Sequence, residues 1–129
     1  MNPSAAMPAF VKLLVTDAAR SRAFYDALGF ELVFADSLFT HLRWGPGADV
    51  FLVTAPAGRE VPAPRGAGVL ICFTVGALVA RPSVDALAAT ARAQVPVPVV
   101  DGPRDQPWFT REVVVMDPDG YRVAFVEPR

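Results

Sequence analysis

Residues 111–128 read REVVVMDPDGYRVAFVEP, and they carry the clearest structural signal in this 129-residue chain. Two runs rich in valine and aromatic residues flank Asp-Pro-Asp-Gly at positions 117–120. Proline presets φ for a turn, and glycine supplies the positive φ that a tight turn needs. The segment therefore predicts a β-hairpin.

The second half of this hairpin has a counterpart earlier in the chain. Residues 45–53, GPGADVFLV, are again a turn rich in proline and glycine that leads into an apolar strand. Matching residues recur at a constant offset: Val50, Leu52 and Val53 correspond to Val123, Phe125 and Val126. The repeat predicts a duplicated module.

Length and composition favour one compact domain. The chain is 53% hydrophobic and 19% charged, which is typical of a globular protein. Its formal net charge of −1 gives no reason to expect nucleic acid or an anionic membrane as a partner. Residues 1–8 lack the basic region and apolar core of a signal peptide, so we expect a cytoplasmic protein. The single Cys72 lies in an apolar run and is expected to be a small buried hydrophobe.

Hydrophobic periodicity predicts the same order of elements in both halves of the chain. The first half has strands at 10–15, 31–35, 40–44 and 50–54, and a helix at 18–28 with Asp17 as N-cap and Gly29 as its stop. The second half has strands at 69–75, 97–100, 111–116 and 121–126, and a helix at 83–94 with Ser83 as cap. The order is βαβββ twice.

These elements predict an α+β fold in a single domain at 1–129. Module one spans about 9–56, a linker rich in proline and glycine about 56–68, and module two about 69–128. Between the second helix and the hairpin lies a polar segment at 100–109 with several prolines, which we interpret as a loop that presents Trp108 and Phe109. Such a loop is a common binding element, although a dimer contact or a lid over an apolar cleft is the alternative.

Two motifs carry a family resemblance. SRAFYDALGF at 21–30 and Asp-Pro-Asp-Gly at 117–120 resemble the vicinal oxygen chelate superfamily, which groups glyoxalase I, extradiol dioxygenases, fosfomycin-modifying enzymes and bleomycin-resistance proteins. The resemblance extends from about Phe10 to Pro128. It implies that two βαβββ modules form a curved mixed sheet with a concave cleft that holds the site, the glyoxalase/bleomycin-resistance fold.

The resemblance also locates where a metal would bind. Enzymes of the family place their ligands at four repeat-related positions, which fall here on Phe10, Phe51, Leu70 and Ala124. None of these side chains is a metal donor, since divalent ions take imidazole, carboxylate, amide oxygen or thiolate. His41, the one histidine, lies outside this pattern. We therefore expect no metal and no cofactor.

A further motif resembles the bleomycin-resistance branch. QPWFTRE at 106–112 is similar to the Gln-Pro-Trp-x-Arg-Glu segment of those proteins, and the spacing from Gly29 to Phe39 matches as well. The resemblance implies that Trp108 and Phe39 clamp a flat heteroaromatic group between the subunits of a homodimer. The nearly neutral charge favours a flat compound that is less charged than a cationic drug.

Strand alternation completes the expected site. It places Phe10, Lys12 and Leu14 on the cleft face, and Val11, Leu13 and Val15 against the helices. Lys12 either meets the ligand or extends to a wet rim. His41 is either a ligand contact or a surface or satisfied strand residue. The predicted ligand-binding residues are Trp108, Phe39, Phe10, Phe51, Leu70, Lys12, Phe109 and His41; no catalytic residue is assigned.

Three functions are compatible with the sequence. The first is a metal-free protein that sequesters a flat or aromatic small molecule, as in antibiotic resistance, in a cleft at a dimer interface. The alternative is a metal-dependent lyase, isomerase or dioxygenase of the superfamily with a displaced site, or an acid–base pair such as His41 with Glu112. A third is a structural or regulatory dimer without a ligand. The sequence favours the binder over the enzyme, and leaves open which face His41 and Arg43 occupy.

Overall fold

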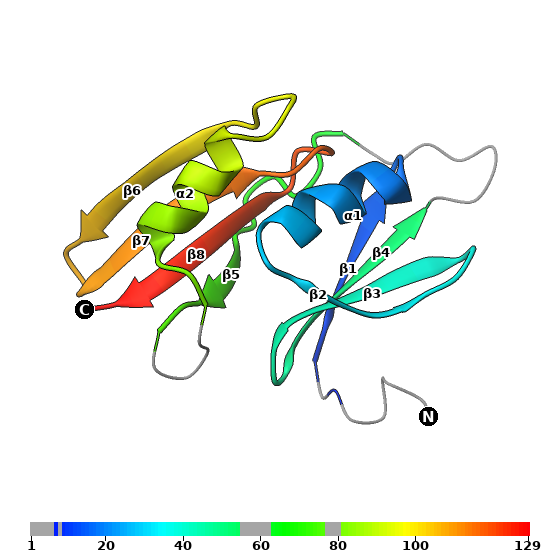
Figure 1. Ribbon diagram of the computed structural model, residues 1–129, viewed down its shortest axis with the longest axis horizontal. Coiled ribbons are helices and arrows are strands. Elements are labelled where there is room, and N and C mark those ends of the chain that lie inside the picture. Colours follow the sequence, from blue (N-terminus) through cyan, green and yellow to red (C-terminus); the bar gives the residue numbers. More distant parts are fainter. Residues whose placement is uncertain (1–6, 8, 55–62, 77–80) are drawn as a thin grey trace. The chain divides into compact units, whose positions relative to one another are not determined.

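The computed structural model describes Met7 and residues 9–54, 63–76 and 81–129 (Figure 1). The chain divides into two compact units, Met1–Pro62 and Ala63–Arg129. The predicted linker at 56–68 lies partly outside the described residues. The module and linker boundaries drawn from the sequence stay a prediction.

The first unit contains β1 (Val11–Val15), α1 (Ala18–Ala27), β2 (Glu31–Ala35), β3 (Phe39–Gly45) and β4 (Ala48–Thr54). Its strands form a mixed sheet in the order β1-β4-β3-β2. β1 runs parallel to β4, because α1 carries the chain across between β1 and the rest of the sheet. The other neighbouring strands are antiparallel.

The second unit repeats this arrangement. It contains β5 (Ile71–Thr74), α2 (Val84–Arg92), β6 (Val100–Gln106), β7 (Thr110–Met116) and β8 (Arg122–Pro128), with the sheet order β5-β8-β7-β6. β5 is parallel to β8, and the other pairs are antiparallel. The predicted α+β fold class with two βαβββ modules is confirmed.

The hairpin predicted from residues 111–128 is β7–β8. Asp117 Oδ1 accepts hydrogen bonds from the backbone N–H groups of Asp119 and Tyr121, each at 2.9 Å. Gly120 has φ +92, a conformation that favours glycine. The repeat between β4 and β8 is also real, because Val50 and Leu52 are as fully buried as their counterparts Val123 and Phe125.

Both helices begin at the predicted caps. Asp17 accepts a hydrogen bond from the Arg20 N–H, and Ser83 accepts one from the Ala86 N–H. In α1, Phe24 and Tyr25 are in the core, whereas Ala23 and Ala27 are exposed.

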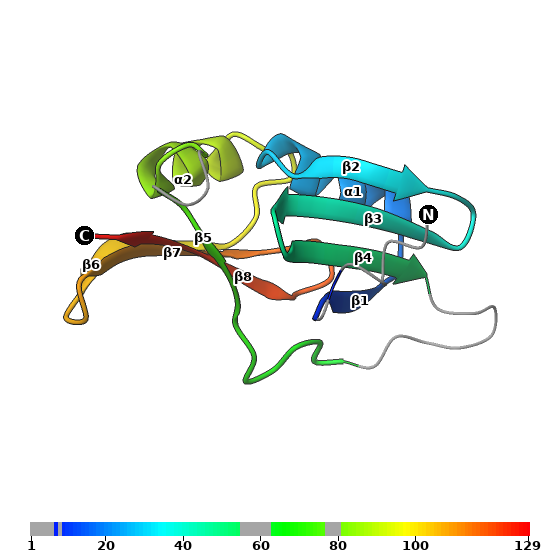
Figure 2. The ribbon, with the colours of Figure 1, turned by 90° about the horizontal axis from the view of Figure 1, so that it is seen from below.

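Each helix packs on one face of its own sheet, and α2 lies along the β5–β8 sheet in Figure 2. Strand alternation decides which side chains face the helix. In β1, Leu13 and Val15 are buried as predicted, whereas Val11 is only half-buried. Lys12, Leu14 and Phe10, which precedes the strand, are exposed. We call the sheet face that does not carry the unit's own helix its open face. The predicted site residues of the strands lie on the open faces.

Three sequence-based expectations about the second unit are wrong. The strand expected at 97–100 is absent, because Pro96 and Pro98 remove donors and leave Val97 and Val99 exposed. Instead, most of the segment read as a loop forms β6, an edge strand, and a register shift between Asp101 and Arg104 accommodates Gly102 and Pro103. Cys72, expected to be buried, is exposed because it lies on the open face of β5.

Candidate functional site: a row of aromatic rings and an aromatic hairpin tip

A row of phenylalanine rings lies on the open face of the first unit. Phe39 and Phe51 stack with ring centroids 5.3 Å apart and an interplanar angle of 18°. Phe10 adds a ring 4.9 Å from Phe51, and Phe34 a ring 5.5 Å from Phe39. We call these four side chains the ring row. Phe34 is 47% exposed and Phe10 is 38% exposed, so the row is accessible at both ends.

His41 lies within the ring row and is completely buried. Its imidazole stacks on Phe51 at a centroid distance of 4.5 Å and an angle of 23°. The strand register pairs His41 with Phe51 and Arg43 with Asp49, so all four side chains lie on the open face. The reading of His41 as a surface residue is therefore wrong.

Asp49 joins His41 to Arg43. Its Oδ1 lies 2.7 Å from His41 Nε2 and accepts a hydrogen bond from Arg43 Nε at 2.8 Å. The Asp49 carboxylate is buried, while the Arg43 side chain reaches toward solvent. His41 Nδ1 and Asp49 Oδ2 are buried and have no hydrogen-bond partner among the described residues. Two buried polar atoms that make no hydrogen bond to the described residues thus lie beside the apolar ring row.

Lys12 borders the ring row. Its register partner across β1 and β4 is Phe51, and its side chain is exposed. This position places a solvated cation at the rim rather than in the interior, which agrees with the expectation that a lysine extends to water.

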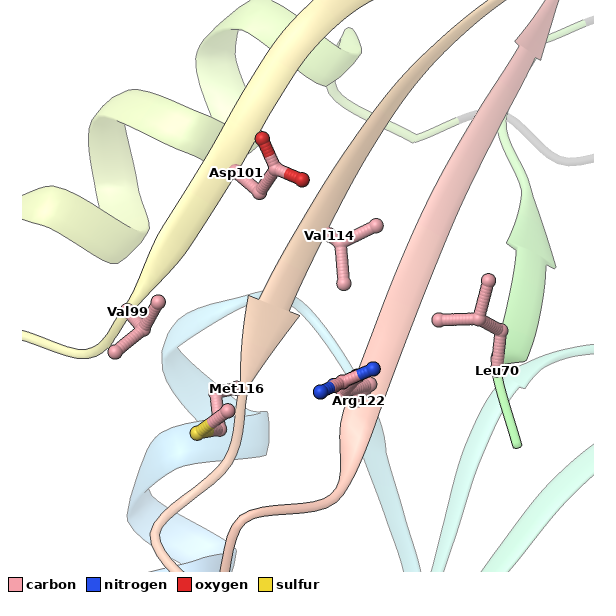
Figure 3. Close-up of a pocket in the computed structure, with 6 residues that line it drawn as sticks. All are labelled: Leu70, Val99, Asp101, Val114, Met116 and Arg122. Carbon is pink, nitrogen blue, oxygen red and sulfur yellow. The ribbon is translucent and has the colours of Figure 1, made fainter. Parts of the chain in front are cut away.

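The open face of the second unit has a different character. A pocket of about 540 Å³ lies over β6, β7 and β8 (Figure 3). Its apolar lining comes from Leu70, Val99, Val114 and Met116, and its charged lining from Asp101 and Arg122. Among these, Leu70 is the residue that the sequence predicted for the site.

Cys72 and Glu112 share this second open face. Partial burial and the neighbouring Glu112 carboxylate raise the pKa of the Cys72 thiol. The thiol is therefore protonated at neutral pH and is a poor nucleophile. Glu112 accepts hydrogen bonds from Trp108 Nε1 at 2.8 Å and from the Thr110 hydroxyl. His41 and Glu112 thus each have partners within their own units.

Trp108 and Phe109 form the turn between β6 and β7, which we call the aromatic tip. Trp108 is 60% exposed and Phe109 is 78% exposed. Phe109 has φ +66, a strained conformation for a residue other than glycine. Its carbonyl accepts a hydrogen bond from the Arg129 N–H at 2.8 Å, and its N–H donates to Gln106. The tip is therefore held in place by its backbone and by the bond from Trp108 to Glu112.

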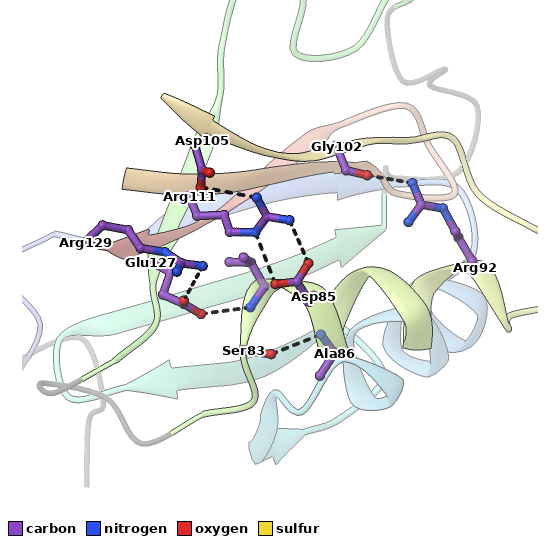
Figure 4. Close-up of polar contacts among 10 residues, drawn as sticks. Ser83, Asp85, Ala86, Arg92, Gly102, Asp105, Arg111, Glu127 and Arg129 are labelled. Carbon is purple, nitrogen blue, oxygen red and sulfur yellow. Dashed lines mark hydrogen bonds and ion pairs between the residues drawn. The ribbon is translucent and has the colours of Figure 1, made fainter. Parts of the chain in front are cut away.

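Polar contacts on the helix side of the second sheet support the tip (Figure 4). Arg111 donates to both carboxylate oxygens of Asp85 at 3.1 and 2.9 Å, and to Asp105 at 3.2 Å. The Arg111 hydrogen bonds lower the pKa of Asp85, and the two carboxylates raise the pKa of Arg111. These contacts tie the start of α2 to the turn end of the β6–β7 hairpin.

The residues at the repeat-related positions do not fit a divalent metal. Phe10, Phe51, Leu70 and Ala124 offer hydrocarbon toward the open faces. Among the residues that the structure describes, no three histidine, cysteine, aspartate or glutamate side chains are grouped as metal ligands would be.

No helix within the described residues is long and apolar enough to span a membrane.

The structure brings five predicted site residues together in the first unit: Phe10, Lys12, Phe39, His41 and Phe51. Leu70, Trp108 and Phe109 belong to the second unit. The sequence prediction missed Phe34 and Asp49. A turn centred on Pro46 and Gly47 sets Asp49 opposite Arg43 in the hairpin, so the register would have revealed Asp49.

A model of the Glyoxalase/Bleomycin resistance protein/Dioxygenase superfamily matches residues 8–125 of the chain. No curated protein matches it in sequence.

Solved structures similar to this one include three proteins that bind or resist antibiotics. TnmS3, an antibiotic binding protein from Streptomyces sp. CB03234, is 24% identical with a TM-score of 0.65, and the match covers 93% of each chain. A bleomycin-binding protein complexed with bleomycin is 20% identical with a TM-score of 0.65, covering 94% of this chain and 98% of that one. A bleomycin resistance determinant encoded on the transposon Tn5 is 21% identical with a TM-score of 0.68, covering 94% and 97%. At these identities the similarity establishes the fold.

Proposed function

Since this chain belongs to the Glyoxalase/Bleomycin resistance protein/Dioxygenase superfamily, we propose that it binds and sequesters a flat aromatic small molecule. The observation that carries this proposal is the ring row on the open face of the first unit. An accessible row of stacked rings offers a further ring the same contacts. Aromatic pairs contribute about 0.5–1.5 kcal/mol each beyond area burial.

The known binding of similar proteins supports the proposal. TnmS3 is an antibiotic binding protein, and a second similar structure holds bleomycin. Because those proteins are under 25% identical, the chemistry of the ligand must come from this chain's own side chains. Those side chains are mainly hydrocarbon rings, which favour a flat compound with few charges.

We further propose that a second copy of the chain completes the site and that Trp108 acts with Phe39 as an aromatic wall. Large apolar side chains are exposed in both units, among them Leu32, Trp108 and Phe109. Pairing of two chains would cover part of this surface. Sedimentation analysis should give twice the mass of one chain, and a monomer at all concentrations would contradict the dimer. The cytoplasmic location stays a prediction.

The binding proposal is tested by a thermal-shift screen across flat aromatic antibiotics and metabolites. A ligand at 100 times its Kd should raise the free energy of unfolding by about 2.7 kcal/mol. The affinity of any hit is then measured for Phe39→Ala and for Leu38→Ala. Leu38 is the matched control, because it is adjacent in sequence and exposed but is no member of the ring row. Phe39→Ala should weaken binding and Leu38→Ala should not; equal effects would contradict the site.

Metal analysis separates the binder from the enzyme alternative. Protein purified without chelator and dialysed extensively should retain no stoichiometric Ni²⁺, Zn²⁺, Mn²⁺ or Fe²⁺, because the repeat-related positions lack donors. Stoichiometric retention of one of these ions would refute the metal-free function and favour a displaced catalytic site.

A further inference from the structure

Two buried polar atoms beside the ring row lack a hydrogen bond. His41 Nδ1 and Asp49 Oδ2 have no hydrogen-bond partner among the described residues, although both groups are almost fully buried. A buried polar atom without a partner loses its hydrogen bonds to water and gains none in return, which is unfavourable. A group from outside the chain that forms the missing hydrogen bond would recover that cost.

The contacts of Asp49 decide what kind of group fits. Asp49 Oδ1 accepts from Arg43 Nε, so it is a carboxylate oxygen and can only accept. His41 Nε2, 2.7 Å from the same oxygen, must therefore carry the imidazole proton. In the neutral imidazole, His41 Nδ1 then has a lone pair and no proton. Both unused atoms are acceptors, and the missing group is a hydrogen-bond donor.

The surroundings favour a neutral donor over a cation. The charge of Asp49 is already balanced by Arg43. The rings of Phe39 and Phe51 offer a hydrocarbon environment next to the imidazole, in which an added unpaired charge is costly to desolvate. A compound with a neutral hydroxyl on an aromatic ring fits both requirements: the ring stacks on the ring row, and the hydroxyl donates to the acceptor.

The strand that carries His41, β3, lies between β4, which carries Asp49, and β2. The two nitrogens of an imidazole point in nearly opposite directions, so Nδ1 points away from Asp49. The register pairs His41 with Phe34 on β2, which is the edge strand. Phe34, the most exposed member of the ring row, therefore lies next to His41 at the edge of the sheet.

We propose that the ligand of the ring row is a hydroxylated aromatic compound whose O–H donates to His41 Nδ1. This inference rests on the proposed binding function and adds the ligand class to it. His41 contacts the ligand, and Asp49 is a positioning residue that holds the imidazole in the accepting tautomer. Arg43 in turn donates a hydrogen bond to Asp49 Oδ1.

The test uses a matched pair of flat probes, 6-hydroxyquinoline and 6-methoxyquinoline, which differ in the donor. Because His41 is the one histidine of the chain, ¹⁵N-histidine labelling gives two imidazole resonances that need no further assignment. We expect a protonated Nε2 and an unprotonated Nδ1 in the free protein. 6-Hydroxyquinoline should shift the Nδ1 resonance and bind about ten-fold more tightly than 6-methoxyquinoline, the upper range for one hydrogen bond.

Two variants separate a ligand contact from a structural role. His41→Phe keeps a flat ring on Phe51 and loses the acceptor, so the preference for the hydroxyl should fall to near one. Asp49→Asn should move the proton toward Nδ1, which would change the ¹⁵N pattern and abolish the preference. If His41→Phe fails to fold, the change of the Nδ1 resonance that 6-hydroxyquinoline causes in the wild-type protein tests the contact by itself.

The outcomes distinguish the two proposals. Failure of both probes to bind the protein would overturn the binding function and this inference together. Equal binding of both probes without an Nδ1 shift would overturn the inference and leave the binding function standing, and would mean that Nδ1 bonds to water. The inference would also be overturned if the wild type and His41→Phe preferred 6-hydroxyquinoline over 6-methoxyquinoline by the same ratio of affinities.

Discussion

The open faces of the two units share a backbone pattern and differ in chemistry. The registers of the two hairpins align Phe39 with Glu112, His41 with Val114, and Phe51 with Ala124. The first unit therefore presents stacked rings where the second presents aliphatic side chains and a carboxylate. The fold is repeated, whereas the surface on which a ligand would stack is not. Function in this protein depends on which side chains occupy equivalent strand positions.

The largest expected effect tests whether buried polar contacts stabilise the open face of the first unit and not that of the second. Asp49→Ala should lower the free energy of unfolding by about 3–5 kcal/mol, because it leaves His41 and Arg43 without their shared acceptor. Arg122 occupies the equivalent position of β8 and is exposed, so Arg122→Ala should change the free energy of unfolding by no more than about 0.5 kcal/mol. Urea unfolding measures both. Similar effects for the two variants would remove this difference between the faces.

A smaller effect tests the aromatic tip, which is the exposed aromatic pair of the second unit. Trp108→Ala should weaken ligand binding by about 1–3 kcal/mol and barely change folding stability, because the side chain is a largely exposed anchor.

Fluorescence checks the same residue directly, since Trp44 is the one other tryptophan and is buried. In a Trp44→Phe background, a screened ligand should change the emission of Trp108. Unchanged emission on binding, or unfolding of Trp108→Ala, would show that the tip is not a ligand wall.

The smallest effect concerns the ion pairs that support the tip. Arg111 holds the pKa of Asp85 below its ordinary value of 3.8, so the contact stabilises the folded state above that pH. The stability is lost as the pH falls through the lowered pKa of the folded state. Asp85→Asn should therefore be slightly less stable than the wild type near pH 7, and the difference should vanish in strong acid. A difference that grows with acidity would contradict this assignment.

The sequence predicted the fold well because its signals are local. Alternation in β1, the caps Asp17 and Ser83, and the Asp-Pro-Asp-Gly turn each follow from a few neighbouring residues. β6 was missed because Gly102 and Pro103 interrupt the apolar pattern, and a bulge at an edge strand accommodates both.

The site was harder to predict because it depends on contacts between strands. Phe10, Phe39 and Phe51 were identified as separate candidates, and the register makes them one row. The burial of His41 and its bond to Asp49 follow from pairing across the β3–β4 hairpin, which composition does not reveal. Cys72 was misplaced because its apolar neighbours in sequence point to both faces of β5.

A crystal structure of the protein with a compound from the thermal-shift screen tests the central claim most directly. We predict that the aromatic plane of the ligand stacks on the ring row, against Phe39 and Phe51 on the first unit's open face. A ligand held in the second unit's pocket, between Val114 and Met116 and away from the ring row, would contradict the account.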